Sequence, residues 1–535
     1  MQTLLVGLDA ACFPVLRPLF EDGDLPHLES LFEDGAAGRL ESQIPPWTAS
    51  AWPSLYTGTN PGTHGVFDFL RFDGYDWDIV NATDVRQRTL WEYADEAGLT
   101  SVVVNAPVTS PPPDIDGAVI PGYLAPEDPP CHPEGILDDV REAVGDYRVY
   151  ARRETDETAG DDRFDDYLEL ARMRGEAFRY LADRFEPEFG FVQFQKTDAV
   201  FHDYPGDREK VRAIYRAVDE QIGEILDACD PDTVVVASDH GMGEYDGREF
   251  RVNEFLREAG VVETTTDGQG VPSWFQIKDE QLTEGGDGPR PAGRPLLERL
   301  AATAADFGLT YQRGKAILER LGLAAFVGRH VPVGAVFAAS DAVDFAASRA
   351  YLRSPSELGV RLNVEGRDPE GVVPADEYER VREEIISLLS SATTPEGTPV
   401  FEEVVPREEY IDGPYAEEAV DVLAVPTDFR HSLSALVGEQ FGDPEPWNHK
   451  RHGVVALAGE GVDADADLGD PHLFDVAPTV LATLGIAPAD LMDGEALPAV
   501  EAPEPRSYPE YEVGAHESTE DAEVAERLSD LGYLE

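Results

Sequence analysis

The chain has 535 residues, and its 106 Asp and Glu residues exceed its 42 Lys and Arg residues, so the formal charge is −64 at pH 7. This charge excludes electrostatic binding to nucleic-acid polymers or to anionic lipid surfaces as the main activity. Because 42% of the residues are apolar and recur in runs throughout, the chain can bury a large core and is not a disordered polyanion.

The acidic composition also indicates the environment in which the protein works. Only five of the 42 basic residues are Lys, and the rest are Arg. Few lysines and an acidic surface are typical of halophilic proteins, in which salt screens the charge and the surface stays hydrated. An ordinary acidic protein from a low-salt cell is the alternative, although self-repulsion would then destabilise its fold.

Three features predict a cytoplasmic protein. The three cysteines are few and far apart, so neither a disulfide framework nor a cysteine metal site is indicated. The first residues, MQTLLVGLDAACF, lack a basic region and lead directly into a strand-like run, which argues against a signal peptide. The longest weakly polar stretch, Leu323–Ser340, is interrupted by an arginine, a histidine and a proline, so no transmembrane span is predicted.

Short Val-rich runs alternate with amphipathic segments over the first 260 residues. The predicted strands are Thr3–Leu8, Ser101–Asn105, Gly190–Gln195 and Thr233–Ala237, and the predicted helices are Thr89–Glu96, Phe164–Arg184 and Lys210–Ala228. Strand-like and helical segments return at Leu362–Val364, Tyr378–Leu389, Gly453–Gly459 and Asp475–Leu484. This alternation predicts an α/β fold with a mainly parallel sheet flanked by helices.

Changes in composition divide the chain into four predicted parts. Residues 1–266 form the first part of the core, and residues 267–343, where a Gly/Asp/Pro-rich stretch replaces the strand pattern, form an inserted cap. Residues 344–497 form the second part of the core, and residues 498–535 form an extended strap with a short helix at 519–528. We expect the cap to lie over the site and to determine the substrate.

Three aspartates follow predicted strands. Asp9 follows LLVGL, Asp198 lies three residues past FVQFQ, and Asp239 follows VVVAS. All three are expected at the carboxyl edge of the sheet, although each alone could instead cap a helix. Asp198 is followed one helical turn later by His202, and Asp239 is followed at once by His240. Carboxylate oxygens and imidazole nitrogens are suitable ligands for Zn²⁺ or Mn²⁺.

Residues 45–69 begin with a pair of prolines, and the hydroxyl-rich segment that follows them is expected to open a helix. Thr48 or Ser50 would then lie near a helix N-terminus, which favours an anion. Coordination to a metal would lower the pKa of such a hydroxyl and make it a nucleophile. A simple capped helix followed by a Gly/Pro turn is the alternative.

Further downstream stand WNHKRHGVVALAG and DPHLFDVAPTVLATLGI, which complete a set of ordered motifs. The set comprises GLD at a strand end, T-x(8)-TG-x(2)-PG-x-HG, D-x(3)-H, SDHGM, H-x(3)-G and D-x-APT-x-L-x-x-LG. With these motifs, the chain resembles the alkaline phosphatase superfamily in its type I phosphodiesterase/nucleotide pyrophosphatase-like branch. The resemblance runs from residue 3 to about 270 and again from about 345 to the end.

The resemblance implies a nucleophile and two divalent cations, Zn²⁺ or Mn²⁺. Thr48 is the implied nucleophile because it precedes Thr57 by nine residues, and Ser50 is the second choice. His449 is preferred to His452 as a ligand because it precedes Gly453 by four residues. The implied ligands are Asp9, Thr48, Asp239 and His240 for one cation, and Asp198, His202 and His449 for the other.

The implied reaction is a two-step displacement on a phosphorylated small molecule or a lipid-linked phosphate. Thr48 attacks phosphorus and water then releases phosphate, whereas an alcohol in place of water would make the protein a phosphotransferase or phosphomutase. The nucleotide pyrophosphatases carry a phosphoryl-binding Asn after the HG motif, where this chain has VFDF at 66–69, which argues against that activity. Arg367 could bind a substrate anion or be a solvated loop residue. A catalytically silent ligand-binding relative is a further alternative.

Overall fold

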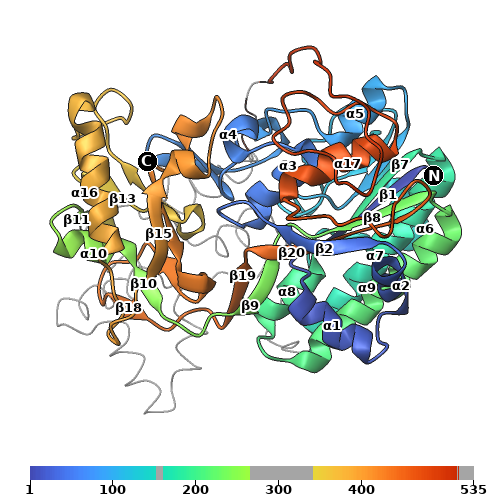
Figure 1. Ribbon diagram of the computed structural model, residues 1–535, viewed down its shortest axis with the longest axis horizontal. Helices are drawn as coiled ribbons and strands as arrows, with labels where there is room; N and C mark the ends of the chain where they lie inside the picture. The colour runs from blue at the N-terminus through green and yellow to red at the C-terminus, as the bar shows by residue number, and fades with distance from the viewer. Residues whose placement is uncertain (152–160, 266–341, 515, 517, 519–535) are drawn as a thin grey trace, which may run out of the picture.

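The computed structural model describes residues 1–151, 161–265, 342–514, 516 and 518. These residues form two lobes, a larger one around a seven-stranded sheet and a smaller one around a four-stranded sheet (Figure 1). No helix within the described ranges is both long and apolar enough to cross a bilayer. The predicted helix at 519–528 and nearly all of the predicted cap at 267–343 lie outside the described residues.

The large lobe is built on a sheet with the strand order β2-β20-β8-β1-β7-β5-β6. The strands are β1 (Thr3–Leu8), β2 (Ala36–Glu41), β5 (Ser101–Val104), β6 (Gly117–Ile120), β7 (Phe189–Phe194), β8 (Thr233–Ala237) and β20 (His452–Gly459). Every pairing from β8 through β6 is parallel, whereas β20 runs antiparallel to both of its neighbours. The predicted α/β class with a mainly parallel sheet is therefore confirmed.

Helices cover both faces of this sheet (Figure 1), and each face has its own hydrophobic cluster. One face is covered by α1 (Phe13–Glu21), α2 (Pro26–Glu33), α6 (Ile136–Val144), α7 (Asp161–Phe185), α8 (Lys196–Asp203) and α9 (Arg208–Cys229). The other is covered by α3 (Thr48–Thr57), α5 (Leu90–Glu96) and α17 (Val476–Thr483). Because both faces are buried, the central strands consist almost entirely of apolar residues.

The small lobe has an antiparallel sheet in the order β13-β14-β16-β15, with a hydrophobic cluster of its own. Its main elements are β13 (Ala350–Tyr351), β14 (Gly359–Leu362), α16 (Tyr378–Ser390), β15 (Phe401–Pro406) and β16 (Val422–Pro426). Beside them lie β10 (Glu249–Arg251), α10 (Val252–Glu258), β11 (Glu263–Thr265), β12 (Ala342–Asp344), β17 (Ser432–Ser434) and β18 (Phe441–Gly442). Residues 344–497 thus contribute to both lobes, a division that the sequence did not predict. A strand was expected at Leu362–Val364, but the strand there, β14, spans Gly359–Leu362 and ends where the expected one begins.

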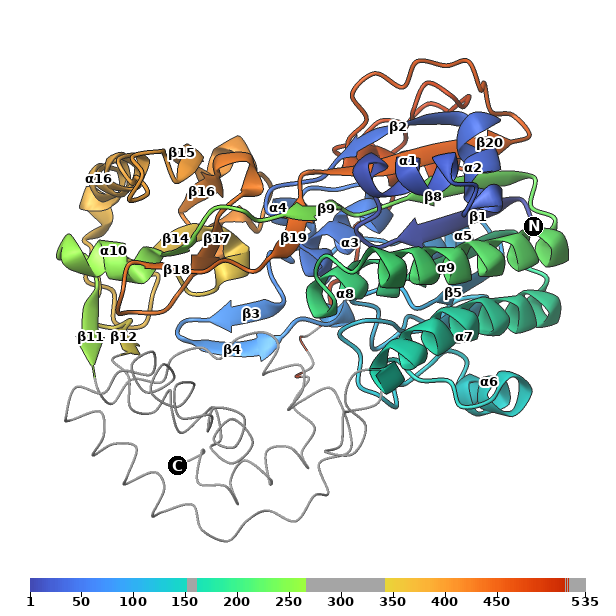
Figure 2. The same ribbon diagram turned by 90° about the horizontal axis from the view of Figure 1, so that it is seen from below.

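Two short antiparallel ribbons lie where the lobes meet (Figure 2). One pairs β9 (Gly241–Glu244) with β19 (Trp447–Lys450), and the other is the hairpin of β3 (Leu70–Asp73) and β4 (Asp76–Ile79), which follows the short helix α4 (Pro61–His64). The hydroxyl of Tyr75, at the tip of the hairpin, donates to Asn363 Oδ1 in the small lobe at 3.0 Å.

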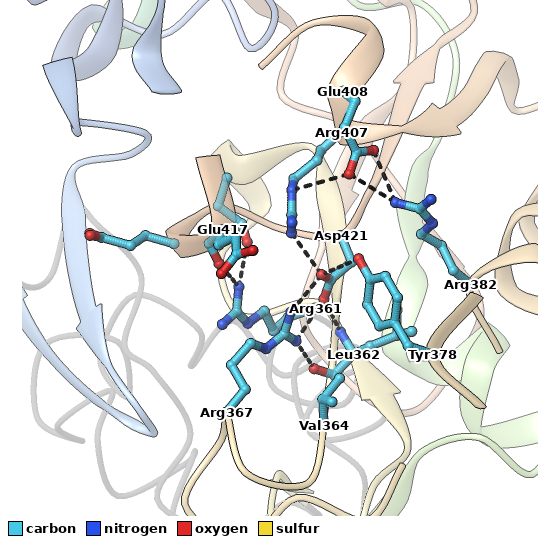
Figure 3. Close-up of polar contacts among 12 residues, drawn as sticks. Arg361, Leu362, Val364, Arg367, Tyr378, Arg382, Arg407, Glu408, Glu417 and Asp421 are labelled. Atoms are coloured by element: carbon cyan, nitrogen blue, oxygen red, sulfur yellow. Dashed lines mark hydrogen bonds and ion pairs between the residues drawn. The ribbon is translucent and has the colours of Figure 1, made fainter. Parts of the chain in front are cut away.

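Asp421 is the centre of a buried ion network in the small lobe (Figure 3). Its carboxylate accepts two hydrogen bonds from Arg367, at 2.7 and 2.9 Å, and one from Arg407 at 2.8 Å. The Tyr378 hydroxyl and the Leu362 N–H also donate to it, at 2.9 and 2.7 Å. Arg367 is therefore an ion-pair partner of Asp421, a contact that the sequence did not predict.

Asp68 links the two lobes, and its environment should make the free energy of unfolding depend on pH. Its Oδ1 accepts from the Ser356 hydroxyl at 2.5 Å. Burial, and then the charge of Glu357, raise the pKa of Asp68 to about 6 from an ordinary value of 3.8. Because the folded state holds this proton more tightly than the unfolded chain, the associated stability is present below about pH 4 and is lost as the pH rises through about 6.

Asp68→Asn should remove this dependence. Relative to the variant, the wild-type free energy of unfolding should fall by about 2 kcal/mol between pH 4 and pH 8. Urea denaturation of both proteins across that range measures the difference. A difference that stays constant with pH would contradict the assignment.

Candidate active site

Three neighbouring strands of the large sheet, β8, β1 and β7, bring the predicted aspartates together. Asp9 directly follows β1, and Asp198 lies in the first turn of α8, which follows β7. Asp239 lies between β8 and β9. The three strands are parallel, so their carboxyl ends meet at one edge of the sheet, where ligand sites form in such folds.

The other predicted site residues come from four different places in the chain. His202 lies one turn after the aspartate of α8, and His240 lies directly before β9. His449 lies on β19, where it is paired across the ribbon with Met242 of β9. Thr48 is the first residue of α3. The structure therefore gathers all seven predicted residues in one region.

His240 stands at the centre of the first group of contacts. Its Nε2 lies 3.2 Å from the Thr48 hydroxyl oxygen and 3.1 Å from Asp239 Oδ2. The same nitrogen lies 3.5 Å from Asp9 Oδ1. Asp9, Asp239 and His240 thus offer ligand atoms that all lie within 4.8 Å of one another, which makes them a group able to hold a metal ion.

Asp198 is the centre of the second group. Its Oδ1 lies 3.3 Å from His202 Nε2 and 3.4 Å from His449 Nε2, and these two nitrogens are 3.3 Å apart. The rings of His449 and His240 stack with their centroids 3.6 Å apart, which joins the two groups. Asp198, His240 and His449 also offer ligand atoms within 4.8 Å of one another, so His240 belongs to both groups.

Backbone carbonyls determine which nitrogen of two histidines faces the site. His449 Nδ1 lies 3.0 Å from the Pro46 carbonyl oxygen, and His240 Nδ1 lies 3.0 Å from that of Gly241. A carbonyl only accepts hydrogen bonds, so each Nδ1 carries a proton, and Nε2 is the nitrogen that faces the aspartates. This is the arrangement in which imidazoles bind metal ions in proteins.

Burial and mutual repulsion perturb the pKa values of the site. Burial, followed by the charges of Asp239 and Asp198, raises the pKa of Asp9 well above its usual range. Burial, followed by the charge of His240, lowers the pKa of His449 to about 4. Burial alone would lower the pKa of His202, but the charge and hydrogen bond of Asp198 raise it to about 9. The site therefore crowds carboxylates and imidazoles into a buried region, where a bound cation would stabilise the ionised carboxylates.

Three carboxylate oxygens in the site are buried and accept no hydrogen bond from the described residues. They are Asp9 Oδ1, Asp198 Oδ1 and Asp239 Oδ2. A buried anionic oxygen that accepts no hydrogen bond is costly, and divalent cations held by the two groups would satisfy these three. The residues present therefore fit metal ions, and the mixed oxygen and nitrogen ligands suit Zn²⁺ or Mn²⁺.

Ser50, the alternative nucleophile, belongs to a buried hydrogen-bond chain. Its hydroxyl accepts from Gln43 Nε2 at 2.7 Å and donates to the carbonyl of the residue before Thr48 at 3.3 Å. Ser54 in turn donates to Gln43 Oε1 and lies 2.8 Å from His64 Nε2. Burial lowers the pKa of His64 to about 3, so its ring is neutral. The hydroxyl of Ser50 is thus used in supporting α3, whereas that of Thr48 faces His240.

Gln193 was not identified from the sequence, although it contacts the site directly. It lies in β7, is fully buried, and donates from Nε2 to Asp9 Oδ2 at 2.8 Å. The signal that could have found it is an amide side chain inside an otherwise apolar strand, FGFVQF. A buried amide requires hydrogen-bond partners, and here one partner is a site residue.

Known proteins resemble this chain in sequence and in fold. A family model described as type I phosphodiesterase/nucleotide pyrophosphatase matches residues 3–307. No curated protein matches the chain significantly. Among solved structures, phosphonoacetate hydrolase from Sinorhizobium meliloti 1021 in complex with phosphonoformate has a TM-score of 0.52 at 16% identity, over 90% of this chain and 95% of that chain. Its complex with phosphonoacetate has a TM-score of 0.48 at the same identity and coverage.

The family model covers more than half of the chain, and the structural likeness shows a shared fold. The matched segment includes six of the seven gathered site residues, since only His449 lies beyond residue 307. The chain therefore belongs to the type I phosphodiesterase/nucleotide pyrophosphatase family, and it is a hydrolase of phosphoester bonds.

Proposed function

We propose that the protein is a metal-dependent phosphodiesterase or phosphatase in which Thr48 is the nucleophile. The observation that carries this proposal is the set of three buried aspartate oxygens that accept no hydrogen bond, gathered around His240 and His449, with the Thr48 hydroxyl 3.2 Å from His240 Nε2. Two cations, Zn²⁺ or Mn²⁺, would be held by Asp9, Thr48, Asp239 and His240 and by Asp198, His202 and His449. When bound, they would supply Lewis acidity and neutralise charge on the phosphoryl group.

The chain itself positions the nucleophile and the phosphoryl group. Thr48 opens α3, and the helical hydrogen bonds begin with the N–H groups of Ser50 and Ala51, so the N–H groups at 48 and 49 point out of the helix end. Together with the helix dipole they favour a phosphoryl oxygen near the hydroxyl.

The proposed reaction has two displacements at phosphorus. Thr48 Oγ1 bonds to phosphorus as the bond to the leaving alcohol breaks, and the alcohol departs with a proton. Water then bonds to phosphorus as the bond to Thr48 Oγ1 breaks, the oxygen takes back a proton, and phosphate departs, or a phosphate monoester where the substrate was a diester. An alcohol in the second step would give phosphotransfer in place of hydrolysis.

The substrate we propose is a phosphorylated small molecule, with a lipid-linked phosphate as the alternative. Thr48 is only 3% exposed, which supports entry of a compact phosphoryl group. We also propose that the protein works in a reducing, salt-rich cytoplasm. Support comes from its three unpaired cysteines and its net charge of −64.

Removal of metal should abolish the activity. We expect the wild-type protein, in molar KCl with Zn²⁺ or Mn²⁺, to hydrolyse nitrophenyl phosphate or bis-nitrophenyl phosphate, since both cations would be needed to neutralise the phosphoryl charge. Treatment with EDTA followed by desalting should reduce the rate to background, and added metal should restore it. Turnover that persists after chelation would refute the metal-dependent mechanism. A faster monoester reaction would identify a phosphatase.

A further inference from the structure

Asp9 is held from one side only. Gln193 Nε2 donates to its Oδ2 at 2.8 Å, and the indole N–H of Trp52 donates to the same oxygen at 3.4 Å. Its other oxygen, Oδ1, accepts no hydrogen bond from the described residues and lies 3.5 Å from His240 Nε2. The carboxylate is therefore fixed with one oxygen engaged and the other free toward the site.

The orientation of the Gln193 amide depends on a second amide. Asn105 Nδ2 donates to Gln193 Oε1 at 2.7 Å and to the Gln193 backbone carbonyl at 3.0 Å. A carboxylate that holds a cation is ionised and can only accept, so Gln193 must turn its amino group toward Asp9 and its carbonyl toward Asn105. Asn105 must then donate to Gln193, so both hydrogen bonds run in the same direction, from Asn105 through Gln193 to Asp9.

The backbone holds Asn105 in place for this contact. Asn105 follows β5 with a φ of 65°, a left-handed conformation that Asn tolerates better than most residues. The backbone of Gly122 passes so close that a Cβ there would lie 2.0 Å from the Asn105 carbonyl oxygen. Because β5, β7 and β1 are adjacent in the sheet, the amide chain crosses three strands to reach Asp9.

We propose that Gln193 and Asn105 are positioning residues for the cation held by Asp9, which rests on the proposed metal site. Asn105 orients the Gln193 amide, and Gln193 orients the carboxylate so that Oδ1 remains available. Both side chains are buried, at 0% and 3% exposure. An apolar residue at 193 would suit the strand, so the amide has a function other than packing. Partners of this kind orient metal ligands and raise metal affinity.

The test measures metal binding rather than turnover. Isothermal titration of the metal-free, full-length protein with Zn²⁺ and with Mn²⁺ compares the wild type with Gln193→Leu and Asn105→Asp. We expect each variant to weaken one of the two binding events by about 10- to 100-fold. Asn105→Asp keeps the shape of the side chain but removes the donor, so Gln193 should turn its carbonyl toward Asp9.

The double variant distinguishes positioning from a structural role. If Asn105 acts through Gln193, Asn105→Asp should have little further effect on affinity once Gln193 is leucine. Gln221→Leu is the matched control, because Gln221 is a buried amide on α9 that pairs with Arg179. Circular dichroism confirms folding, and the near-isosteric Asn105→Asp alone carries the test if Gln193→Leu does not fold.

The outcomes separate this inference from the proposed function. A wild-type protein that binds neither metal would refute the metal site itself. Tight wild-type binding with unchanged affinity in both variants would overturn the positioning role alone. An equal loss in Gln221→Leu, or additive effects in the double variant, would likewise overturn it.

Discussion

Replacing Thr48 with alanine is expected to lower kcat/KM for phosphoester hydrolysis by about 10⁴-fold, the scale on which removal of a catalytic nucleophile acts. The Thr48 hydroxyl lies 3.2 Å from His240 Nε2 at the start of α3, and no phosphothreonine can form without it. Steady-state rates with the better nitrophenyl ester, at fixed metal and KCl concentrations, measure the loss.

Two neighbouring variants provide the controls. Thr48→Ser keeps a hydroxyl at the same position and should retain part of the activity. Ser50→Ala removes the other candidate hydroxyl, which is used in the Gln43 chain, and should change the rate by less than about tenfold. If Ser50→Ala abolished the reaction while Thr48→Ala did not, Ser50 would be the nucleophile.

Replacing Asp421 with asparagine should cost the protein about 3–5 kcal/mol of stability, as expected when one partner of a buried ion pair is removed. Arg367 and Arg407 would keep their charges in the interior of the small lobe, where their side chains are only 23% and 8% exposed. Urea denaturation measures the loss. Asp246→Asn is the control, because the Asp246–Arg430 pair is 58% and 50% exposed and should contribute less than about 1 kcal/mol.

The effect of Asp421→Asn should also depend on pH. Burial alone would raise the pKa of Asp421, but the hydrogen bonds and charge of Arg367, followed by the charge of Arg361, lower it overall. A folded pKa below the unfolded one gives stability that is present above the unfolded pKa, near 3.8, and lost as the pH falls through the folded value. The two proteins should therefore approach equal stability in acid, and a difference that grew there would contradict this account.

The parts of the fold that the sequence predicted are those in which burial is nearly complete. Strands β1 and β8 were predicted to the residue, because helices cover both faces of the sheet and favour apolar side chains at nearly every position. The clustering of Asp9, Asp198 and Asp239 followed from the same sheet, since their strands are parallel. The small lobe has strands of two to six residues, too short for a clear hydrophobic period.

Other features depend on contacts between residues that are distant in sequence. Arg367 is 54 residues from Asp421, and Asn105 is 88 residues from Gln193. Local patterns contain no information about such pairs, because strand order and register decide which side chains meet. For this reason the network around Asp421 and the amide chain to Asp9 emerged only from the structure.

The ribbon of β9 and β19 connects the two lobes, so it bears on how the lobes could move relative to each other. The chain passes from the large lobe to the small lobe after β9 and comes back to the large lobe at β19. His240 lies directly before β9, and His449 lies within β19. An insertion with closely spaced ends can change in length without altering the order of the sheet that carries it. Any rotation of the small lobe would therefore pivot next to two of the proposed metal ligands, and it would change the distance between their imidazole rings.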